Sequence, residues 1–330
     1  MVDSYGRALD YLRLSITDRC NLRCLYCMPK DGVEWKSHDA ILSFEEILTS
    51  CRILANRGIR KIKITGGEFL VRKDAVNLIR KIKAVPGIEE LSVTTNGLLL
   101  EPCLEELAAV PLSGINISLN TLSAQTFRRI SGYDKPGYPA AVLQSIEHAR
   151  SLGIPVKINC VPLKNININE LVDIAALAEK TVDAVRFIEL MPIGCAAKME
   201  SMQAEDIRAI LEQHYGKLQR VKKNIGNGPA VYYSAAGFSG TIGMINAMTE
   251  GFCETCNRLR LTPEGLLKPC LSSDMTLDLR SLLRSGASDE YISKCIEEII
   301  ARKPAGHSFS GIYGNVKKNH TDKDMFRIGG

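Results

Sequence analysis

The chain has 330 residues, a formal net charge of +5 and an apolar content of 45%. This composition is typical of globular proteins, and no apolar run reaches the roughly 18 residues of a membrane-spanning helix. The N-terminus lacks the apolar core of a secretory signal, so we expect a cytoplasmic protein with no membrane partner. A charge of +5 suits a small anionic ligand, but it is too small and too dispersed to indicate nucleic-acid binding.

The chain contains 11 cysteines, an odd number. In a reducing compartment this argues against a disulfide framework and favours metal or cluster ligation by some of the thiols.

The first half of the sequence alternates between expected strands and expected helices. A helix should begin at the capping-box pair Ser43 and Glu46 and end near Gly58. Strands are predicted at residues 11–16, 61–65, 90–95, 114–119, 155–161 and 183–190. Six such units predict an α/β fold, either a doubly wound sheet or, as we favour, an incomplete (β/α)6 TIM-like barrel. In both architectures the active site lies at the carboxyl ends of the strands.

The pattern changes after about residue 191. We expect a helix at 201–216, short strands and turns at 217–270 and two helices at 276–302. The predicted organisation is a partial barrel in residues 1–195 and a C-terminal extension in residues 196–330 that closes the open side.

Three cysteines directly follow the first expected strand. Cys20, Cys24 and Cys27 are spaced C-x3-C-x2-C, and structural zinc usually needs four ligands. A [4Fe–4S] cluster held by three thiolates instead leaves one iron open to a small molecule. The spacing, with the aromatic Tyr26 before the last cysteine, resembles the signature of radical S-adenosylmethionine enzymes.

A second triad lies near the C-terminus. Cys253, Cys256 and Cys270 are spaced C-x2-C-x13-C, again without a fourth cysteine or a nearby histidine. Zinc completed by a remote residue stays open as an alternative. Between these cysteines, Arg258 and Arg260 would share one face of a strand, which is either a solvated face or part of a ligand site.

Motifs along nearly the whole chain resemble the GTP-cyclising family of radical S-adenosylmethionine enzymes, which acts in molybdenum cofactor biosynthesis. They are "LRLSITDRCNLRCLYCMP", "KITGGEFLVR", "TTNGLLL", "NISLNTL", "VKINCV", "RFIELMPIG" and the terminal "IGG". The resemblance implies two [4Fe–4S] clusters. Cys20, Cys24 and Cys27 would hold the cluster that cleaves S-adenosylmethionine, and Cys253, Cys256 and Cys270 a second cluster whose open iron contacts guanine.

The resemblance also assigns the ligand contacts. The residues matching S-adenosylmethionine positions are Tyr26, Gly67, Ser118 and Met191. Those matching GTP positions are Arg13, Lys63, Thr94, Lys157, Arg258, Leu259 and Arg260, with Lys61 and Arg186 as further candidates. Arg258 and Arg260 would also act in catalysis together with Gly329 and Gly330, a terminal pair expected to enter the active site.

The implied reaction is the conversion of GTP to (8S)-3′,8-cyclo-7,8-dihydroguanosine 5′-triphosphate. An electron splits S-adenosylmethionine, the 5′-deoxyadenosyl radical takes hydrogen from C3′ of the ribose, and C3′ then bonds to C8. The implied partners are an electron donor such as flavodoxin or ferredoxin and the downstream cyclic pyranopterin monophosphate synthase. A homodimer is compatible with the resemblance.

Two residues depart from the family pattern, and two other functions stay open. Phe69 stands where the family commonly has proline, and Asn120 where it commonly has aspartate. The alternatives are a peptide-modifying radical S-adenosylmethionine enzyme with an auxiliary cluster, and a zinc-stapled binding module. The five remaining thiols are expected in or near the core, namely Cys51, Cys103, Cys160, Cys195 and Cys295.

Overall fold

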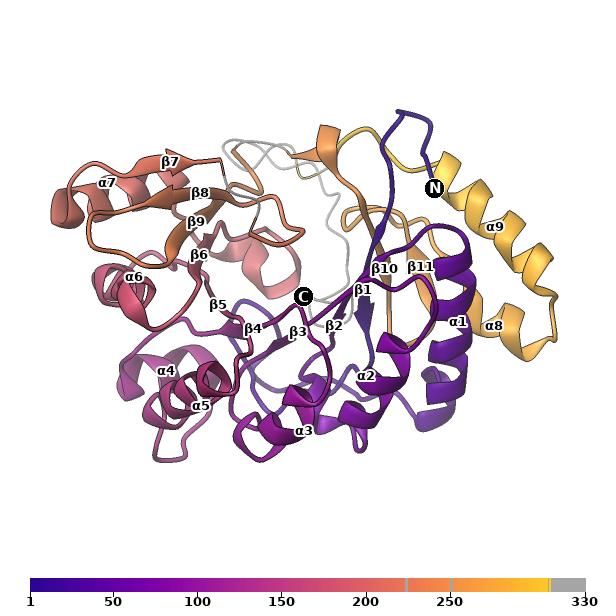
Figure 1. The fold of residues 1–330 in the computed structure, drawn as a ribbon, viewed down its shortest axis with the longest axis horizontal. Helices are drawn as coiled ribbons and strands as arrows, with labels where there is room; N and C mark the ends of the chain where they lie inside the picture. Colours follow the sequence, from indigo (N-terminus) through magenta and orange to yellow (C-terminus); the bar gives the residue numbers. More distant parts are fainter. Residues whose placement is uncertain (223–224, 250–251, 308, 310–330) are drawn as a thin grey trace. The chain divides into compact units, whose positions relative to one another are not determined.

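The computed structural model describes residues 1–330 except 223–224, 250–251, 308 and 310–330 (Figure 1). The chain divides into two compact units. Unit 1 comprises Met1–Asn21, Asp31–Ser92 and Cys253–Gly330, and unit 2 comprises Leu22–Lys30 and Val93–Phe252.

The sheet of unit 1 joins the two ends of the sequence. Its strands are β1 (Tyr11–Ser15), β2 (Lys61–Thr65), β10 (Arg258–Leu261), β11 (Leu266–Lys268) and β12 (Leu277–Asp278). They follow the order β12-β11-β10-β1-β2, in which β1 pairs in parallel with both β10 and β2. The β10–β11 and β11–β12 pairs are antiparallel. The C-terminal segment therefore completes the sheet that the N-terminal strand begins.

Four helices belong to unit 1: α1 (Phe44–Asn56), α2 (Ala75–Lys83), α8 (Leu279–Arg284) and α9 (Asp289–Ala301). Helix α1 begins with the predicted capping box. The backbone amide of Glu46 donates to Ser43 Oγ at 3.1 Å, and the amide of Ser43 donates to the Glu46 carboxylate at 2.7 Å. This pairing satisfies two amides that the first helical turn would otherwise leave without partners.

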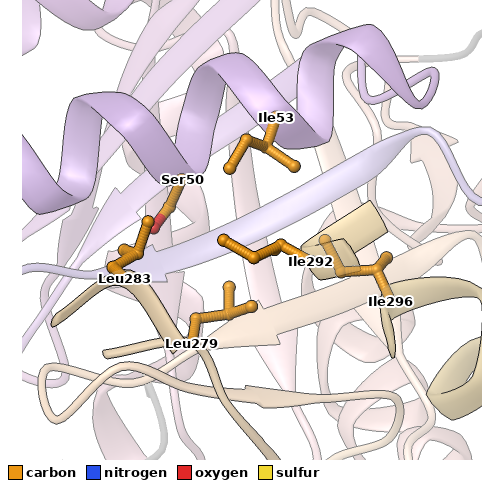
Figure 2. A pocket seen from close by; sticks show the side chains of 6 residues that line it. All are labelled: Ser50, Ile53, Leu279, Leu283, Ile292 and Ile296. Carbon is orange, nitrogen blue, oxygen red and sulfur yellow. The ribbon is translucent and has the colours of Figure 1, made fainter. Parts of the chain in front are cut away.

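Helices α8 and α9 pack against α1 through an apolar contact. Figure 2 shows the side chains that line it: Ser50, Ile53, Leu279, Leu283, Ile292 and Ile296. None of them carries a charge, so this pocket is a packing contact and not a site for an anionic ligand.

The sheet of unit 2 contains β4 (Gly114–Ser118), β5 (Val156–Cys160), β6 (Ala184–Ile188), β7 (Gln219–Val221), β8 (Val231–Ser234) and β9 (Thr241–Ile245). Its order is β4-β5-β6-β9-β8-β7; β4, β5, β6 and β9 run parallel, and β8 and β7 are antiparallel additions. The helices are α3 (Leu104–Ala108), α4 (Ala124–Ser131), α5 (Ala140–Ser151), α6 (Leu171–Lys180) and α7 (Ala204–Tyr215). Strand β3 (Glu90–Thr95) carries the chain from unit 1 into unit 2.

Short 3-10 helices connect several of these elements. They are η1 (His38–Ala40), η2 (Phe69–Val71), η3 (Glu101–Cys103), η4 (Ile168–Glu170), η5 (Gly194–Lys198) and η6 (Cys253–Thr255).

The six predicted strands are all present as β1 to β6, and the α/β class with a parallel-rich sheet is confirmed. The helix expected at 201–216 is α7, and the two expected at 276–302 are α8 and α9. The division at residue 195 stays a prediction, because both units extend across other parts of the chain. Among the described residues, no helix is both long enough and apolar enough to cross a membrane.

In unit 2, a histidine on α5 interacts with two carboxylates of the η3–α3 segment. His148 Nδ1 lies 2.7 Å from Glu101 Oε1, and its Nε2 lies 3.5 Å from Glu105 Oε1. The hydrogen bond to Glu101, with the charges of both carboxylates, raises the pKa of His148 above its ordinary value of 6.5. The protonated histidine therefore stabilises the folded state.

This contact predicts a pH-dependent contribution to stability. Because the pKa is higher in the folded state, the contribution is complete below the unfolded value of 6.5 and is lost as pH rises through the folded pKa. The Tm of the parent should exceed that of His148→Gln at about pH 5.5, and the difference should shrink toward about pH 9. A Tm difference that is constant across this range, or that grows with pH, would contradict the prediction.

Candidate active site

The first cysteine triad is divided between the two units. Cys20 follows β1 in unit 1, whereas Cys24 and Cys27 belong to unit 2. The amides of Cys27 and Met28 both donate to the carbonyl oxygen of Cys24, at 2.8 and 3.0 Å. This tight turn brings the second and third cysteines of the motif close together along the backbone.

The segment around these two cysteines is anchored to the end of α4. The amide of Arg23 donates to Ser131 O and that of Leu25 to Ile130 O, both at 2.8 Å. Leu25 and Tyr26 also pack against a buried apolar cluster that includes Ile130. The loop therefore has a defined position within unit 2.

Asn120 bonds directly to the aromatic residue of the cysteine motif. Its Nδ2 donates to Tyr26 Oη at 2.8 Å, and its Oδ1 accepts from the amide of Val161 at 2.8 Å. Burial and the neighbouring cysteines Cys24 and Cys27 raise the pKa of Tyr26 well above its ordinary value, so the phenol is neutral. The amide suits this position, because it can donate to the tyrosine and accept from the backbone at the same time.

The Gly66–Gly67 turn after β2 packs against the segment that precedes Cys20. The amide of Gly67 donates to Thr17 O at 2.9 Å, and the amide of Glu68 donates to Arg19 O at 2.8 Å. A Cβ atom on Gly67 would lie 2.3 Å from Arg19 O and 2.9 Å from the Cβ of Cys20. Glycine is therefore required here for close backbone approach. Phe69, at the start of η2, is fully buried.

The second triad lies wholly in unit 1. Its first two members are joined by a hydrogen bond from the amide of Cys256 to Cys253 O at 3.2 Å. Burial tends to raise the pKa of Cys256, but the charges of Arg258 and Lys303 and hydrogen bonds from Arg258 outweigh it and lower the pKa overall. Cys270 Sγ lies 3.4 Å from Ser272 Oγ. A thiol that readily becomes a thiolate fits the donor set of an iron–sulfur cluster.

Among residues outside the masked segments, no group of three or more histidine, cysteine, aspartate or glutamate side chains is arranged to hold a metal ion. The ligand roles of the six cysteines therefore stay predictions that rest on spacing and on the state of the thiols.

Four cations occupy one transverse row of the unit 1 sheet. Arg13 on β1 is the register partner of Lys63 on β2 and of Arg260 on β10, and Arg260 is in turn the partner of Lys268 on β11. Register partners project from the same face of a sheet, so these side chains are neighbours. Arg260 is 8% exposed and Lys268 is fully buried.

Burial and the positive charges of Arg13 and Arg258 lower the pKa of Arg260 well below its ordinary value, while Cys270 and Cys256 oppose this shift. The row is thus a site of strong positive potential that favours an anion. Sequence reasoning identified three members of the row but missed Lys268, because only the β10–β11 register places it there.

The candidate Lys61 has a different environment. Its Nζ lies 3.2 Å from Asp10 Oδ2 and 3.8 Å from Glu90 Oε1. These carboxylates partly offset its charge, and its role as a GTP contact stays a prediction.

In unit 2, Lys157 lies on β5 and Arg186 on the neighbouring strand β6. Arg186 Nη2 donates to Asn116 Oδ1, and Lys157 Nζ donates to Ile225 O at 3.3 Å. A Cβ atom on Gly243, the register partner of Arg186, would lie 2.8 Å from the Arg186 Cγ, so this glycine leaves room for the arginine. Within the described part of the chain, no hydrogen-bond partner is found for the buried Arg186 Nε, which favours an additional ligand there.

The other predicted contacts fall at strand ends or outside the described residues. Ser118 ends β4, Thr94 lies near the end of β3, and Met191 follows β6. Leu259 is fully buried, so only its backbone is left as a candidate for GTP contact. Gly329 and Gly330 lie outside the described residues.

Comparisons with known proteins match the whole chain. The family model described as "Radical SAM superfamily" matches residues 14–178, and the model "Molybdenum Cofactor Synthesis C" matches residues 183–309. A GTP 3′,8-cyclase of Clostridium perfringens (strain SM101 / Type A) is 43% identical over all of both chains. Another, of Desulforamulus reducens, is 45% identical over 93% of this chain and 95% of its own. The chain belongs to the GTP 3′,8-cyclase family.

Similarity to solved structures supports the same fold. Streptococcus suis SuiB bound to S-adenosylmethionine has a TM-score of 0.63 and 16% identity, covering 97% of this chain and 77% of that one. At this identity the match shows the fold alone. Membership of the radical S-adenosylmethionine superfamily implies a [4Fe–4S] cluster and S-adenosylmethionine as cofactors.

The other cysteines are outside both motifs. Cys51 and Cys160 are fully buried, as expected of small core residues, and burial raises the pKa of Cys51 to about 12. Cys103, Cys195 and Cys295 are partly buried.

The Gly66–Gly67 turn supplies a direct test of the first cluster site. Gly67→Ala should displace the backbone between Arg19 and Cys20, because the added methyl has no space there. Iron bound per chain and S-adenosylmethionine affinity should both fall. The matched control is Gly228→Ala, since a Cβ atom at Gly228 meets nothing within 4 Å. Parent-like iron content and affinity in Gly67→Ala would contradict this account of the turn.

Proposed function

We propose that this chain converts GTP to (8S)-3′,8-cyclo-7,8-dihydroguanosine 5′-triphosphate, an early step of molybdenum cofactor biosynthesis. The observation that carries the proposal is the row of cations in unit 1, which shares strand β10 with the segment following Cys256. The cations would bind the phosphates of a nucleotide, and the neighbouring thiolates would ligate an iron–sulfur cluster.

The residues of the row bind and orient the substrate. Arg13, Lys63 and Arg260 supply positive charge to the triphosphate, and an arginine guanidinium can contact two phosphate oxygens at once. Arg258 hydrogen-bonds to the side chain of Cys256 and so links the nucleotide site to the second triad. When bound, the cluster and S-adenosylmethionine supply the one-electron chemistry that starts bond formation between C3′ and C8.

The second triad completes the proposal. Cys253, Cys256 and Cys270 would hold a second [4Fe–4S] cluster with one iron open to the guanine base, and the lowered pKa of Cys256 supports a thiolate ligand there. Lys157 and Arg186 are further cations for the substrate, with Thr94 as a polar contact. The terminal Gly329 and Gly330 would assist Arg258 and Arg260 in the step after S-adenosylmethionine cleavage.

We further propose that Ser118, Tyr26, Gly67 and Met191 contact S-adenosylmethionine. The protein would receive electrons from a flavodoxin- or ferredoxin-type donor and pass its product to a cyclic pyranopterin monophosphate synthase. A homodimer and a cytoplasmic location belong to the same proposal.

The deciding experiment compares two cysteine variants under anaerobic conditions. The parent should hold about eight irons per chain, and Cys24→Ser and Cys256→Ser about four each. Cys24→Ser should form neither 5′-deoxyadenosine nor the cyclised nucleotide. Cys256→Ser should still cleave S-adenosylmethionine but lose the cyclised product, because only substrate binding depends on its triad.

Mass spectrometry of the nucleotide and metal analysis give the readouts. A parent that cleaves S-adenosylmethionine but leaves GTP unchanged would refute the proposed reaction. A parent that holds zinc and no iron would instead support a zinc-stapled module.

A further inference from the structure

Two buried cations in unit 1 lie outside the row and have no place in the proposed reaction. Lys303, which follows α9, is 2% exposed, and Arg7, in the segment before β1, is 8% exposed. A buried cation costs free energy unless polar groups surround it, so the partners of these two residues are informative.

The second triad has two arms, the segment with Cys253 and Cys256 and the segment with Cys270. Lys303 joins these two arms. Its Nζ donates to Arg258 O at 3.0 Å and also to Pro269 O. Arg258 is two residues after Cys256, and Pro269 immediately precedes Cys270. One ammonium group therefore bonds to the backbone of both arms that carry the thiols.

Arg7 performs the corresponding task for Cys253. Its Nη1 donates to Cys253 O at 2.8 Å and to Ala305 O at 2.9 Å, and its Nη2 donates to Pro304 O at 2.7 Å. Its Nε is held by an ion pair with Asp3 Oδ2 at 2.6 Å. The guanidinium thus ties the first cysteine of the triad to the chain that follows Lys303.

We propose that Lys303 and Arg7 are positioning residues of the second cysteine triad, which hold its cysteine-bearing arms in place, and that Lys303 also sets a positive charge beside its thiolates. The inference rests on the proposed second cluster. The β10–β11 pair brings the two arms together, but the three cysteines lie beyond the ends of these strands, in 3-10 and irregular segments, so strand pairing alone does not fix them. Charge-assisted bonds to backbone carbonyls supply that constraint.

The charge of Lys303 acts on the Cys256 thiol, whereas the Arg7 guanidinium is paired with Asp3. A positive group beside the cluster thiolates stabilises the more negative, reduced form of the cluster, so removing it lowers the reduction potential. A residue that only supported the fold would leave the reduction potential unchanged. A measured change in potential therefore distinguishes an electrostatic role of Lys303 from a purely structural one.

The test uses a full-length parent in which Cys20, Cys24 and Cys27 are replaced by serine, so that only the second triad can bind iron. In this parent, Lys303→Met should increase the rate of iron loss to a chelator by about tenfold or more, as for other groups that orient metal ligands. It should also lower the midpoint potential in an EPR-monitored titration. Lys303→Arg should largely restore both.

The matched control is Arg52→Met. Arg52 also contacts α9, through Asp289 Oδ2 at 2.6 Å, but it is solvent-exposed and bonds to neither arm. It should leave iron loss and potential unchanged. Parent-like values in Lys303→Met would overturn the inference while leaving the second cluster in place, whereas an iron-free parent would remove the second cluster and the inference with it.

A second variant covers failure of Lys303→Met to fold. Arg7→Lys keeps the charge but cannot bridge the carbonyls of Cys253, Pro304 and Ala305 simultaneously. With far-UV circular dichroism like that of the parent, it should also lose iron faster. An unchanged rate of iron loss in Arg7→Lys would overturn the proposed positioning role of Arg7.

Discussion

Unit 1 places four cations in one row of its sheet, and their mutual repulsion is the main physical constraint on this unit. Neighbouring like charges in a partly buried setting repel by on the order of a few kcal/mol, and burial removes the hydration that would otherwise offset this. Cys270 and Cys256 of the second triad oppose the lowering of the Arg260 pKa, but burial and the charges of Arg13 and Arg258 outweigh them. A polyanionic ligand would add negative charge beside the row, so the same feature favours the proposed binding of a nucleotide triphosphate.

The cysteine segments are held by backbone contacts more than by regular secondary structure. The segment before Cys20 lies against the Gly66–Gly67 turn, and Cys24 and Cys27 share a turn anchored to the end of α4. In the second triad, Arg7 and Lys303 bond to carbonyl oxygens on both arms. Each triad is therefore positioned by contacts between segments far apart in sequence.

The local features of the fold could be predicted from the sequence because they depend on local chemistry. The alternation of apolar residues predicted β1 to β6, and the pair Ser43 and Glu46 predicted the start of α1. The three cations Arg13, Lys63 and Arg260 were identified by resemblance to a family. What could not be predicted was their common row, since it requires β10 to pair with β1 across about 245 positions of sequence. Lys268, Lys303 and Arg7 were missed for the same reason: their partners come from distant segments or from backbone carbonyls, which leave no side-chain pattern.

The most direct test of the cation row is the thermal stabilisation of the protein by GTP compared with guanosine at equal concentration. GTP should raise the Tm strongly at low salt and less at high salt, and guanosine should raise it little, because the triphosphate relieves repulsion in the row. The GTP effect should shrink in Arg260→Met. If guanosine stabilises the parent as much as GTP does, or if Arg260→Met keeps the full GTP effect, the row is not the site that binds the triphosphate.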